Sequence, residues 1–420
     1  MNKIIKRIIA SVLVACALVG VFFLGYFFKD ITMDSELREV YQFLQTYKKH
    51  YLYDEEGNLV KDISNVILDE YSQYYTKEEY ERVDAEGYGN MTDIGLIFKG
   101  NSLNIKKVAG NSPSKLAGIK VGGVLVEMDT GSGFTTLSSY TDFSLKIEAV
   151  KENAYVGLKI DYDGEVKTYS VQKRDYKRTY VEYADSQGVY AFSDKDGKMA
   201  LYKTEEESFI EDNAIGYIKY DKFYGRDSGL LGSAGQITEV LNKFKNDGKS
   251  KVIVDLRGNG GGYIDILCNI ARHFIDGDKS GNNLILYGKD KNDRRIEYYS
   301  KSSLYDNYNF EKIIVLADES SASASECFIG AVLDYDKTDK VTVLISSSTS
   351  GGKTVYKTYG KGIMQTTYKH IDGSAVKLTV AQIYWPISNT TIHKIGVIGQ
   401  DSGKILAVDK ENALQKALEI

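Results

Sequence analysis

Apolar runs alternate with amphipathic stretches from residue 213 to the C-terminus, and this alternation limits the folds open to the chain. Four short runs rich in β-branched residues are predicted to be strands: 215–220, 252–256, 313–316 and 341–345. The amphipathic stretches are predicted to be helices: 233–244, 264–274, 324–335 and 409–419. Because strands that are separated by helices usually pair in one sheet, the pattern predicts an α/β core with packed helices.

Residues 87–176 differ in pattern, with short β-like runs and little helix. Five runs are predicted to be strands: 94–98, 103–108, 124–128, 155–162 and 166–171. A short helix is predicted after Ser112-Pro113, and a second over 142–150. These elements suit a small mixed domain.

The stretch before this domain has apolar residues at helical spacing over 34–83. Thr76 and Glu79 fit a capping box, in which each side chain binds the other residue's backbone N–H. The domains expected after the first 30 residues are therefore a helical region (31–87), a small mixed domain (88–176) and the α/β core (177–420).

Residues 1–30 are predicted to be a cytoplasmic tip and a transmembrane anchor. Lys3, Lys6 and Arg7 precede an uncharged run over 8–28, and about 20 apolar residues span a bilayer. Basic residues at the N-terminal flank keep that end cytoplasmic, so the rest of the chain is expected outside the cytoplasm. A cleaved signal peptide and lipidation at Cys16 are the alternatives.

The composition excludes several classes of function. A net charge of -5 argues against a broad nucleic-acid-binding surface. The three cysteines have no C-x-x-C spacing, and Cys268 and Cys327 are expected to be small buried side chains. The four histidines include no H-E-x-x-H. The sequence therefore predicts neither a metal nor a cofactor.

A serine among very small neighbours lies in the segment S-S-A-S-A-S-E at 320–326. It follows a predicted strand and opens a predicted helix, where free backbone N–H groups favour negative charge. Ser323 could therefore act as a nucleophile whose attack on a carbonyl group forms an oxyanion. Taken alone, the segment is better explained by helix caps and small-residue packing.

A lysine with a glutamine four residues on lies in the Gly-Lys-Gly segment that ends at Gln365. Lys361 would serve as a general base if burial lowered its pKa, and Gln365 could orient its amine without adding charge. On a strand the two side chains share a face. A lysine at an ordinary glycine-rich turn is the alternative.

A glycine-rich loop follows the predicted strand 252–256, with the sequence R-G-N-G-G-G. Neither G-x-x-x-x-G-K-[ST] nor G-x-G-x-x-G is present, which argues against a nucleotide phosphate. Backbone N–H groups of such a loop can instead be presented to an oxyanion. A plain tight turn is the remaining alternative.

Together these segments resemble the C-terminal processing peptidases, also called tail-specific proteases. The similar segments occur in the family's order: 69–76 (D-E-Y-S-Q-Y-Y-T), 95–98 (G-L-I-F), 112–119, 215–218, 255–259, 320–326, 359–365, 377–379 and 396–401. The resemblance implies an α/β (α+β) protease core with mixed sheets and packed helices. It also implies that the small domain is an inserted PDZ domain.

The resemblance also implies roles for individual residues. Ser323 would be the nucleophile, Lys361 the general base and Gln365 the residue that orients it. Backbone amides implied for the oxyanion are those of Gly258, Gly260, Gly261 and Ala324. The PDZ residues implied to bind the apolar C-terminus of a protein or peptide substrate are Gly95, Leu96, Ile97 and Phe98. No cofactor is implied, and a homodimer through the N-terminal helices is an option.

Two departures from the family pattern are visible. The spacing from Ser323 to Lys361 is longer than usual, and the extra residues fall in the Ser- and Gly-rich stretch 346–357, which we expect to be a surface loop. Asp318 and Ser320 replace a usual asparagine and glycine. The main alternative function is a non-catalytic PDZ scaffold that binds C-terminal peptides, and a penicillin-interacting enzyme is a third.

Overall fold

The structure is a computed structural model that describes residues 39–40, 43–44, 59–195, 198–308 and 310–420. The predicted membrane segment 8–28 and Cys16 lie outside these residues. Within the described ranges, no helix is both long and apolar enough to cross a membrane. The chain divides into two units, 1–66 and 67–420, and α3 (Leu59–Ile67) begins in the first. The rest of this description concerns the second unit.

The largest sheet has eight strands, in the order β12-β11-β10-β13-β14-β17-β18-β23. Their bounds are β10 (Val181–Asp185), β11 (Gly188–Lys195), β12 (Lys198–Lys203), β13 (Ile215–Tyr220), β14 (Lys251–Asp255), β17 (Lys312–Ala317), β18 (Val341–Ser346) and β23 (Ile405–Val408). The strands from β13 to β23 are parallel, whereas β10, β11 and β12 form an antiparallel meander. The predicted α/β core is therefore confirmed.

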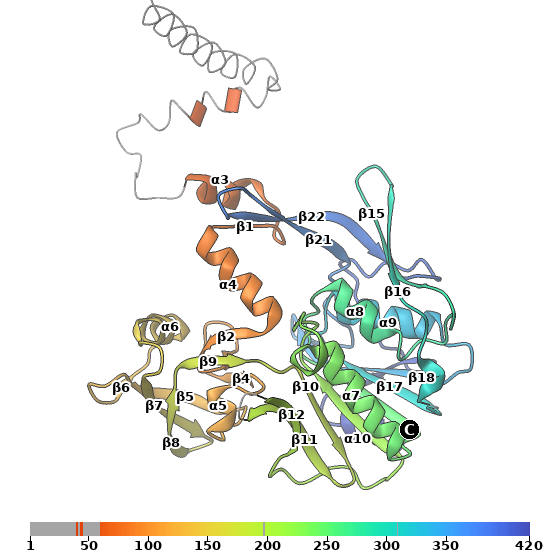
Figure 1. The fold of residues 1–420 in the computed structure, drawn as a ribbon, viewed down its shortest axis with the longest axis horizontal. Coiled ribbons are helices and arrows are strands. Elements are labelled where there is room, and N and C mark those ends of the chain that lie inside the picture. Colours follow the sequence, from red (N-terminus) through yellow and green to blue (C-terminus); the bar gives the residue numbers. More distant parts are fainter. Residues whose placement is uncertain (1–38, 41–42, 45–58, 196–197, 309) are drawn as a thin grey trace, which may run out of the picture. The chain divides into compact units, whose positions relative to one another are not determined.

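Helices cover both faces of this sheet (Figure 1). On one face lie α7 (Ser233–Asn246), α8 (Ile264–Ala271) and α9 (Ala324–Asp334), which share a core with the apolar side chains of the parallel strands. On the other face α10 (Ala413–Glu419) buries Ala413 and Ala417 against Ile253, Ile314 and Leu344. Because β14 and β17 are buried on both faces, they read as continuous apolar runs.

A second sheet joins distant parts of the chain. Its order is β1-β22-β15-β16, and β21 pairs with β22. The bounds are β1 (Gln73–Tyr75), β15 (Asn283–Lys289), β16 (Arg295–Ser300), β21 (Ile363–Lys369) and β22 (Ala375–Tyr384). Residues 73–75 were expected to be helical; instead they form a strand, because their backbone pairs with residues 375–377.

The predicted capping box at Thr76 is confirmed. Thr76 Oγ1 accepts the N–H of Glu79, and Glu79 Oε2 accepts the N–H of Thr76, at the start of α4 (Lys77–Tyr88). Two 3₁₀ turns, η1 (Gly229–Leu231) and η2 (Tyr305–Asn307), also lie among the described residues.

The small domain has a hydrophobic core of its own, formed by side chains between Ile94 and Val171. Its elements are β2 (Asn90–Asp93), β3 (Leu96–Phe98), β4 (Ile105–Val108), α5 (Pro113–Leu116), β5 (Val124–Asp129), β6 (Thr135–Thr136), α6 (Tyr140–Ala149), β7 (Tyr155–Tyr162), β8 (Glu165–Gln172) and β9 (Arg174–Lys177). Strands β2 and β9 pair with each other, and so bring together the two ends of the domain.

The stretch 346–357 contains a hairpin of two short strands, β19 (Ser348–Ser350) and β20 (Lys353–Val355). Gly351 and Gly352 both have positive φ, as a two-residue hairpin turn requires. Most of these residues are exposed, which agrees with the expected surface loop.

Candidate active site

Ser323 lies at the sharp turn between β17 and the first residue of α9. Its φ of 55° and ψ of -113° fall in a region that side-chain-bearing residues rarely adopt. Such strain persists only where surrounding contacts impose it, and it is concentrated at functional sites. The turn leaves Ser323 half-buried, while Ala322 and Ala324 on either side are buried.

The other serines of the segment have structural bonds or no backbone strain. Ser321 Oγ donates to the carbonyl of Leu256 at 2.8 Å, and Ser325 Oγ donates to the carbonyl of Asn259 at 2.8 Å. Both side chains are fully buried. Ser320 has an ordinary φ. Ser323 is therefore the serine of this segment best placed to react.

Lys361 lies two residues before β21, and Gln365 lies within that strand. Lys361 Nζ donates to Gln365 Oε1 at 2.9 Å, so the sequence prediction that these side chains meet holds in the structure. Gln365 Nε2 in turn donates to the carbonyl of Tyr71, in the turn before β1. Burial, aided by the charge of Lys377, lowers the pKa of Lys361. A lowered pKa is what a lysine base needs.

The buried carboxylate of Glu326 connects the serine and lysine segments. Its Oε2 accepts the N–H of Ser323 at 2.8 Å and the N–H of Lys361 at 3.0 Å. Its Oε1 accepts the N–H of Gly360 at 2.8 Å and the hydroxyl of Thr358 at 2.5 Å. Burial raises the pKa of Glu326, while these four donors act in the opposite direction. One oxygen atom of Glu326 thus accepts the backbone N–H groups of both candidate catalytic residues.

The side chains of Ser323 and Lys361 are not hydrogen-bonded to each other, although the structure describes both. The amine of Lys361 is directed to Gln365 instead, and its Nζ lies 5.6 Å from the centroid of the Tyr71 ring. The backbones of the two residues are nevertheless held together, because one Glu326 oxygen accepts the N–H groups of both.

The glycine-rich loop packs directly on Ser323. A Cβ added to Gly261 would lie 2.9 Å from Ser323 Cβ and 2.8 Å from the nitrogen of Ala324, so only glycine fits. The buried side chain of Asn259 holds the loop by donating to the carbonyl of Tyr220 and accepting the N–H of Gly261. Asn259 also accepts the N–H of Ala322 at its carbonyl.

Two of the four predicted oxyanion amides are already bonded. The N–H of Gly258 donates to Asp318 Oδ1 at 2.9 Å, and that of Gly261 donates to Asn259 at 2.9 Å. By contrast, Gly260 is exposed and no acceptor for its N–H lies among the described residues. The N–H of Ala324, the first residue of α9, likewise has no acceptor among the described residues.

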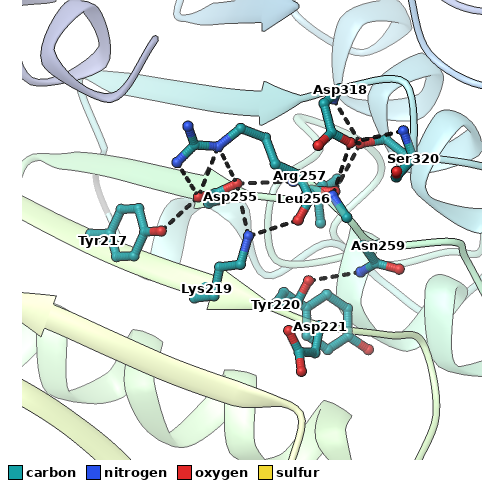
Figure 2. Close-up of polar contacts among 12 residues, drawn as sticks. Tyr217, Lys219, Tyr220, Asp221, Asp255, Leu256, Arg257, Asn259, Asp318 and Ser320 are labelled. Atoms are coloured by element: carbon teal, nitrogen blue, oxygen red, sulfur yellow. Dashed lines mark hydrogen bonds and ion pairs between the residues drawn. The ribbon is translucent and has the colours of Figure 1, made fainter. Parts of the chain in front are cut away.

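An ionic network around Asp255 holds the start of the glycine-rich loop (Figure 2). Asp255, at the end of β14, accepts from the hydroxyl of Tyr217 at 2.6 Å and from Arg257 through its backbone and guanidinium. Lys219 Nζ lies 3.2 Å from the same carboxylate. Although burial opposes it, the charges of Lys219 and Arg257 hold the pKa of Asp255 below its usual range. The residues before Gly258 are therefore rigidly placed.

The four residues predicted to bind peptide lie at one edge of the small domain. Leu96, Ile97 and Phe98 form β3, which pairs on one side with β4 and has no second partner among the described strands. The Phe98 ring packs edge-on against Phe143 of α6, with 5.0 Å between centroids. Gly95 precedes the strand with φ +80°. An open strand edge beside an apolar helix can accept an extended peptide.

Sequence reasoning missed three contributors to the site. Glu326 was read as the end of the serine motif, yet its spacing of three from Ser323 is that of a capping box. Asp318, noted as a departure, fixes the glycine loop and the N–H of Ser320. The carbonyl of Tyr71 has no sequence signal, because a backbone contact depends only on the fold.

Comparisons with known proteins agree with this geometry. The sequence profile described as peptidase family S41 matches residues 214–400. Probable CtpA-like serine proteases of Staphylococcus aureus (strain bovine RF122 / ET3-1) and Staphylococcus epidermidis (strain ATCC 12228 / FDA PCI 1200) are each 27% identical and match 82% of this chain. The chain spans 60% and 61% of the length of these two relatives.

A solved structure shares the fold. The photosystem II D1 C-terminal processing protease superposes with a TM-score of 0.52 at 20% identity, over 92% of this chain and 90% of that one. All the residues of the candidate site between Tyr217 and Gln365 fall inside the matched family region. Residues 214–400 of the chain are thus similar to peptidase family S41, and the chain shares the fold of a C-terminal processing protease.

Proposed function

We propose that this protein is a serine endopeptidase in which Ser323 attacks the peptide bond and Lys361 is the general base. The observation that carries the proposal is the single Glu326 oxygen that accepts the backbone N–H groups of both residues. It supports a shared site for a strained serine and a lysine of lowered pKa, and such a pair needs no histidine.

In the proposed reaction, neutral Lys361 takes the proton of Ser323 Oγ as that oxygen bonds to the substrate carbonyl carbon. The protonated lysine then gives the proton to the leaving amine, and an acyl-enzyme remains. Water, deprotonated by the same lysine, hydrolyses the ester and restores Ser323. Gln365 holds the lysine amine through its Oε1 at 2.9 Å in the resting arrangement.

The tetrahedral intermediates carry an oxyanion, for which we propose the amides of Gly260 and Ala324. Both lie at the glycine loop and helix start that touch Ser323, and neither has an acceptor among the described residues. A Cβ added to Gly260 would have open space around it, which leaves room for a substrate. Preorganised N–H donors of this kind stabilise the transition state.

We also propose that residues 88–176 are a PDZ domain that captures apolar C-termini of protein substrates. The support is the unpaired edge of β3 beside α6, with Phe98 and Phe143 at its apolar side. Retention in the membrane through 8–28, with the catalytic part outside the cytoplasm, is proposed from the basic and apolar residues there. A homodimer remains an open part of the proposal.

The experiment combines an active-site serine probe with peptide cleavage. We expect a fluorophosphonate probe to label the wild type, and Ser323→Ala to lose both labelling and cleavage of a peptide with an apolar C-terminus. Lys361→Ala and Lys361→Arg should also lose cleavage, since arginine stays charged. Ser320→Ala and Lys357→Ala, which change neighbours of the same types, serve as controls and should keep activity.

A non-catalytic peptide-binding scaffold is the competing function. The open β3 edge is compatible with it. Such a protein would bind the peptide but would be neither labelled nor active. Unlabelled wild-type protein, or full cleavage by Ser323→Ala, would therefore reject the proposed peptidase mechanism.

A further inference from the structure

Lys222 lies in a tight turn that packs on the glycine loop of the candidate active site. The turn follows β13, and the N–H of Tyr224 donates to the carbonyl of Lys222 at 2.8 Å. Phe223 pairs with the loop, because its N–H donates to the carbonyl of Gly261 at 3.0 Å. Gly261 is the residue that touches Ser323. Lys222 is thus next in sequence to Phe223, whose backbone binds the glycine loop that packs on Ser323.

The amine of Lys222 forms no ion pair among the described residues, although the carboxylate of Glu86 lies near enough to oppose the lowering of its pKa. Its Nζ lies 3.7 Å from the centroid of the Tyr224 ring, and no carboxylate or hydrogen-bond acceptor binds it among the described residues. The side chain is half-buried. Burial and the nearby positive charge of Arg178 lower the pKa of Lys222 to about 8. A lysine held in this way is costly for the free protein and favourable for an arriving anion.

Arg178 is a second cation with unmet hydrogen-bonding capacity at the same place. Its Nε is buried and has no hydrogen-bond partner. The neighbouring carboxylate, Asp221, is already bound by Lys107 at 2.9 Å, and Arg178 reaches it only at 3.7 Å. Lys377 adds a further positive charge that acts on both Lys222 and Lys361. The cluster therefore has more positive than negative charge and two unsatisfied donors.

We propose that Lys222 and Arg178 form a carboxylate-binding subsite for the substrate polypeptide, beside the Ser323–Lys361 pair. The subsite deepens the proposed peptidase function and rests on it. The amine of Lys222 and the guanidinium of Arg178 can each donate to a carboxylate oxygen, and charge-assisted bonds of this kind are among the stronger hydrogen bonds of proteins. The subsite would favour substrates that place a carboxylate a short distance from the cleaved bond.

The carboxylate can come from the C-terminus of the substrate or from an Asp or Glu side chain. Three versions of one peptide with an apolar C-terminal sequence distinguish these sources. The first has a free C-terminus and no acidic residue, the second is amidated and neutral, and the third is amidated with one internal Asp at varied positions. The version that gains affinity through Lys222 identifies the source.

The test measures binding of fluorescent peptides to the full-length protein carrying Ser323→Ala, so that it does not depend on cleavage. We expect at least one carboxylate-bearing peptide to bind about tenfold tighter than the neutral peptide. Adding Lys222→Gln should weaken binding of that peptide but not of the neutral one, whereas adding Lys222→Arg should change neither; any preference for a free C-terminus that the β3 edge supplies is the same in all three proteins. Lys106→Gln, which removes an exposed lysine of β4, is the matched control and should change nothing.

Two results would overturn the subsite: no carboxylate-bearing peptide that loses affinity on Lys222→Gln, or equal binding of all three peptides. Thermal unfolding of each variant identifies misfolded protein, and Lys222→Arg keeps the test valid if the glutamine variant fails to fold. The peptidase mechanism itself is judged separately, by probe labelling of wild-type Ser323. Failure of the subsite and failure of the proposed chemistry therefore give different results.

Discussion

The backbone N–H of Lys361 donates to the carboxylate of Glu326 at 3.0 Å, across 35 positions of sequence. The same carboxylate oxygen accepts the N–H of Ser323. The distance between the two candidate catalytic residues is therefore set by one side chain rather than by the connecting chain. The hairpin β19–β20 can lie between them in sequence because it does not enter this arrangement.

We predict that Glu326→Gln lowers both stability and activity. A glutamine of the same shape would turn an NH₂ group toward two of the four donors now bound, at a side chain that is fully buried. The free energy of unfolding should fall by about 3 kcal/mol, measured by urea denaturation. Cleavage should fall at least about tenfold at a temperature where the variant is folded.

The matched control for this variant is Glu319→Gln, which makes the same change at an exposed carboxylate of the same turn. It should leave stability within about 0.5 kcal/mol of the wild type. If Glu326→Gln behaves like Glu319→Gln, the carboxylate does not hold the two segments together.

We predict that Ser323→Gly gives a more stable protein than Ser323→Ala. The φ of 55° at this position strains any residue with a Cβ, and glycine adopts it freely. The difference in unfolding free energy should be about 1 kcal/mol, and both variants should be inactive. Equal stabilities of the two variants would show that the turn does not keep its strained conformation once Ser323 is replaced.

Much of the fold could be predicted because local patterns and tertiary structure agree. The parallel strands β13, β14, β17 and β18 are apolar on both faces, and the helices between them have one apolar side. The strand β1 could not be predicted, because its conformation is imposed by pairing with residues 375–377. Strands β21 and β22 likewise depend on a partner for their identification.

The candidate site also contains some features that local sequence predicts and others that depend on the fold. Ser323, Lys361 and Gln365 carry reactive or orienting groups that a motif can reveal. The bond from Gln365 to the Tyr71 carbonyl depends on backbone position alone. Which loop amides remain free also depends on the fold, because the acceptors that occupy Gly258 and Gly261 come from Asp318 and Asn259. Local sequence does not specify such pairings.

Acid should weaken the fold through His273. This side chain is 3% exposed, and its ring nitrogens bind Tyr308 and Thr238. Burial lowers the pKa of His273 from 6.5 to about 4, so between these values the unfolded chain binds the proton and the folded one does not. The contribution is fully present above pH 6.5 and is lost as the pH falls toward 4.

We predict that His273→Gln removes this part of the pH dependence, which amounts to about 3 kcal/mol. The check is the free energy of unfolding from urea titrations between neutral and mildly acidic pH. His370→Gln changes an exposed histidine and should leave the acid limb unchanged. An unchanged limb in His273→Gln would assign the acid sensitivity to other groups.

The residue that accepts from the amine of Lys361 is a neutral glutamine rather than a carboxylate. Lys361 Nζ donates to Gln365 Oε1, and burial already holds the pKa of Lys361 below its usual value. Gln365→Glu keeps the acceptor oxygen but adds a negative charge, which stabilises the protonated amine and raises its pKa. Because only the neutral amine can accept the serine proton, the acid limb of kcat should move to higher pH.

At pH 7 the rate of Gln365→Glu should therefore fall by about tenfold or more, and it should recover as the pH is raised. Gln365→Ala separates charge from orientation, since it removes the acceptor without adding a carboxylate. That variant should be slower across the whole pH range, with no upward shift of the limb. An acid limb that stays in place in Gln365→Glu would mean that its pKa belongs to a group other than Lys361, and the lysine would lose its role as the base.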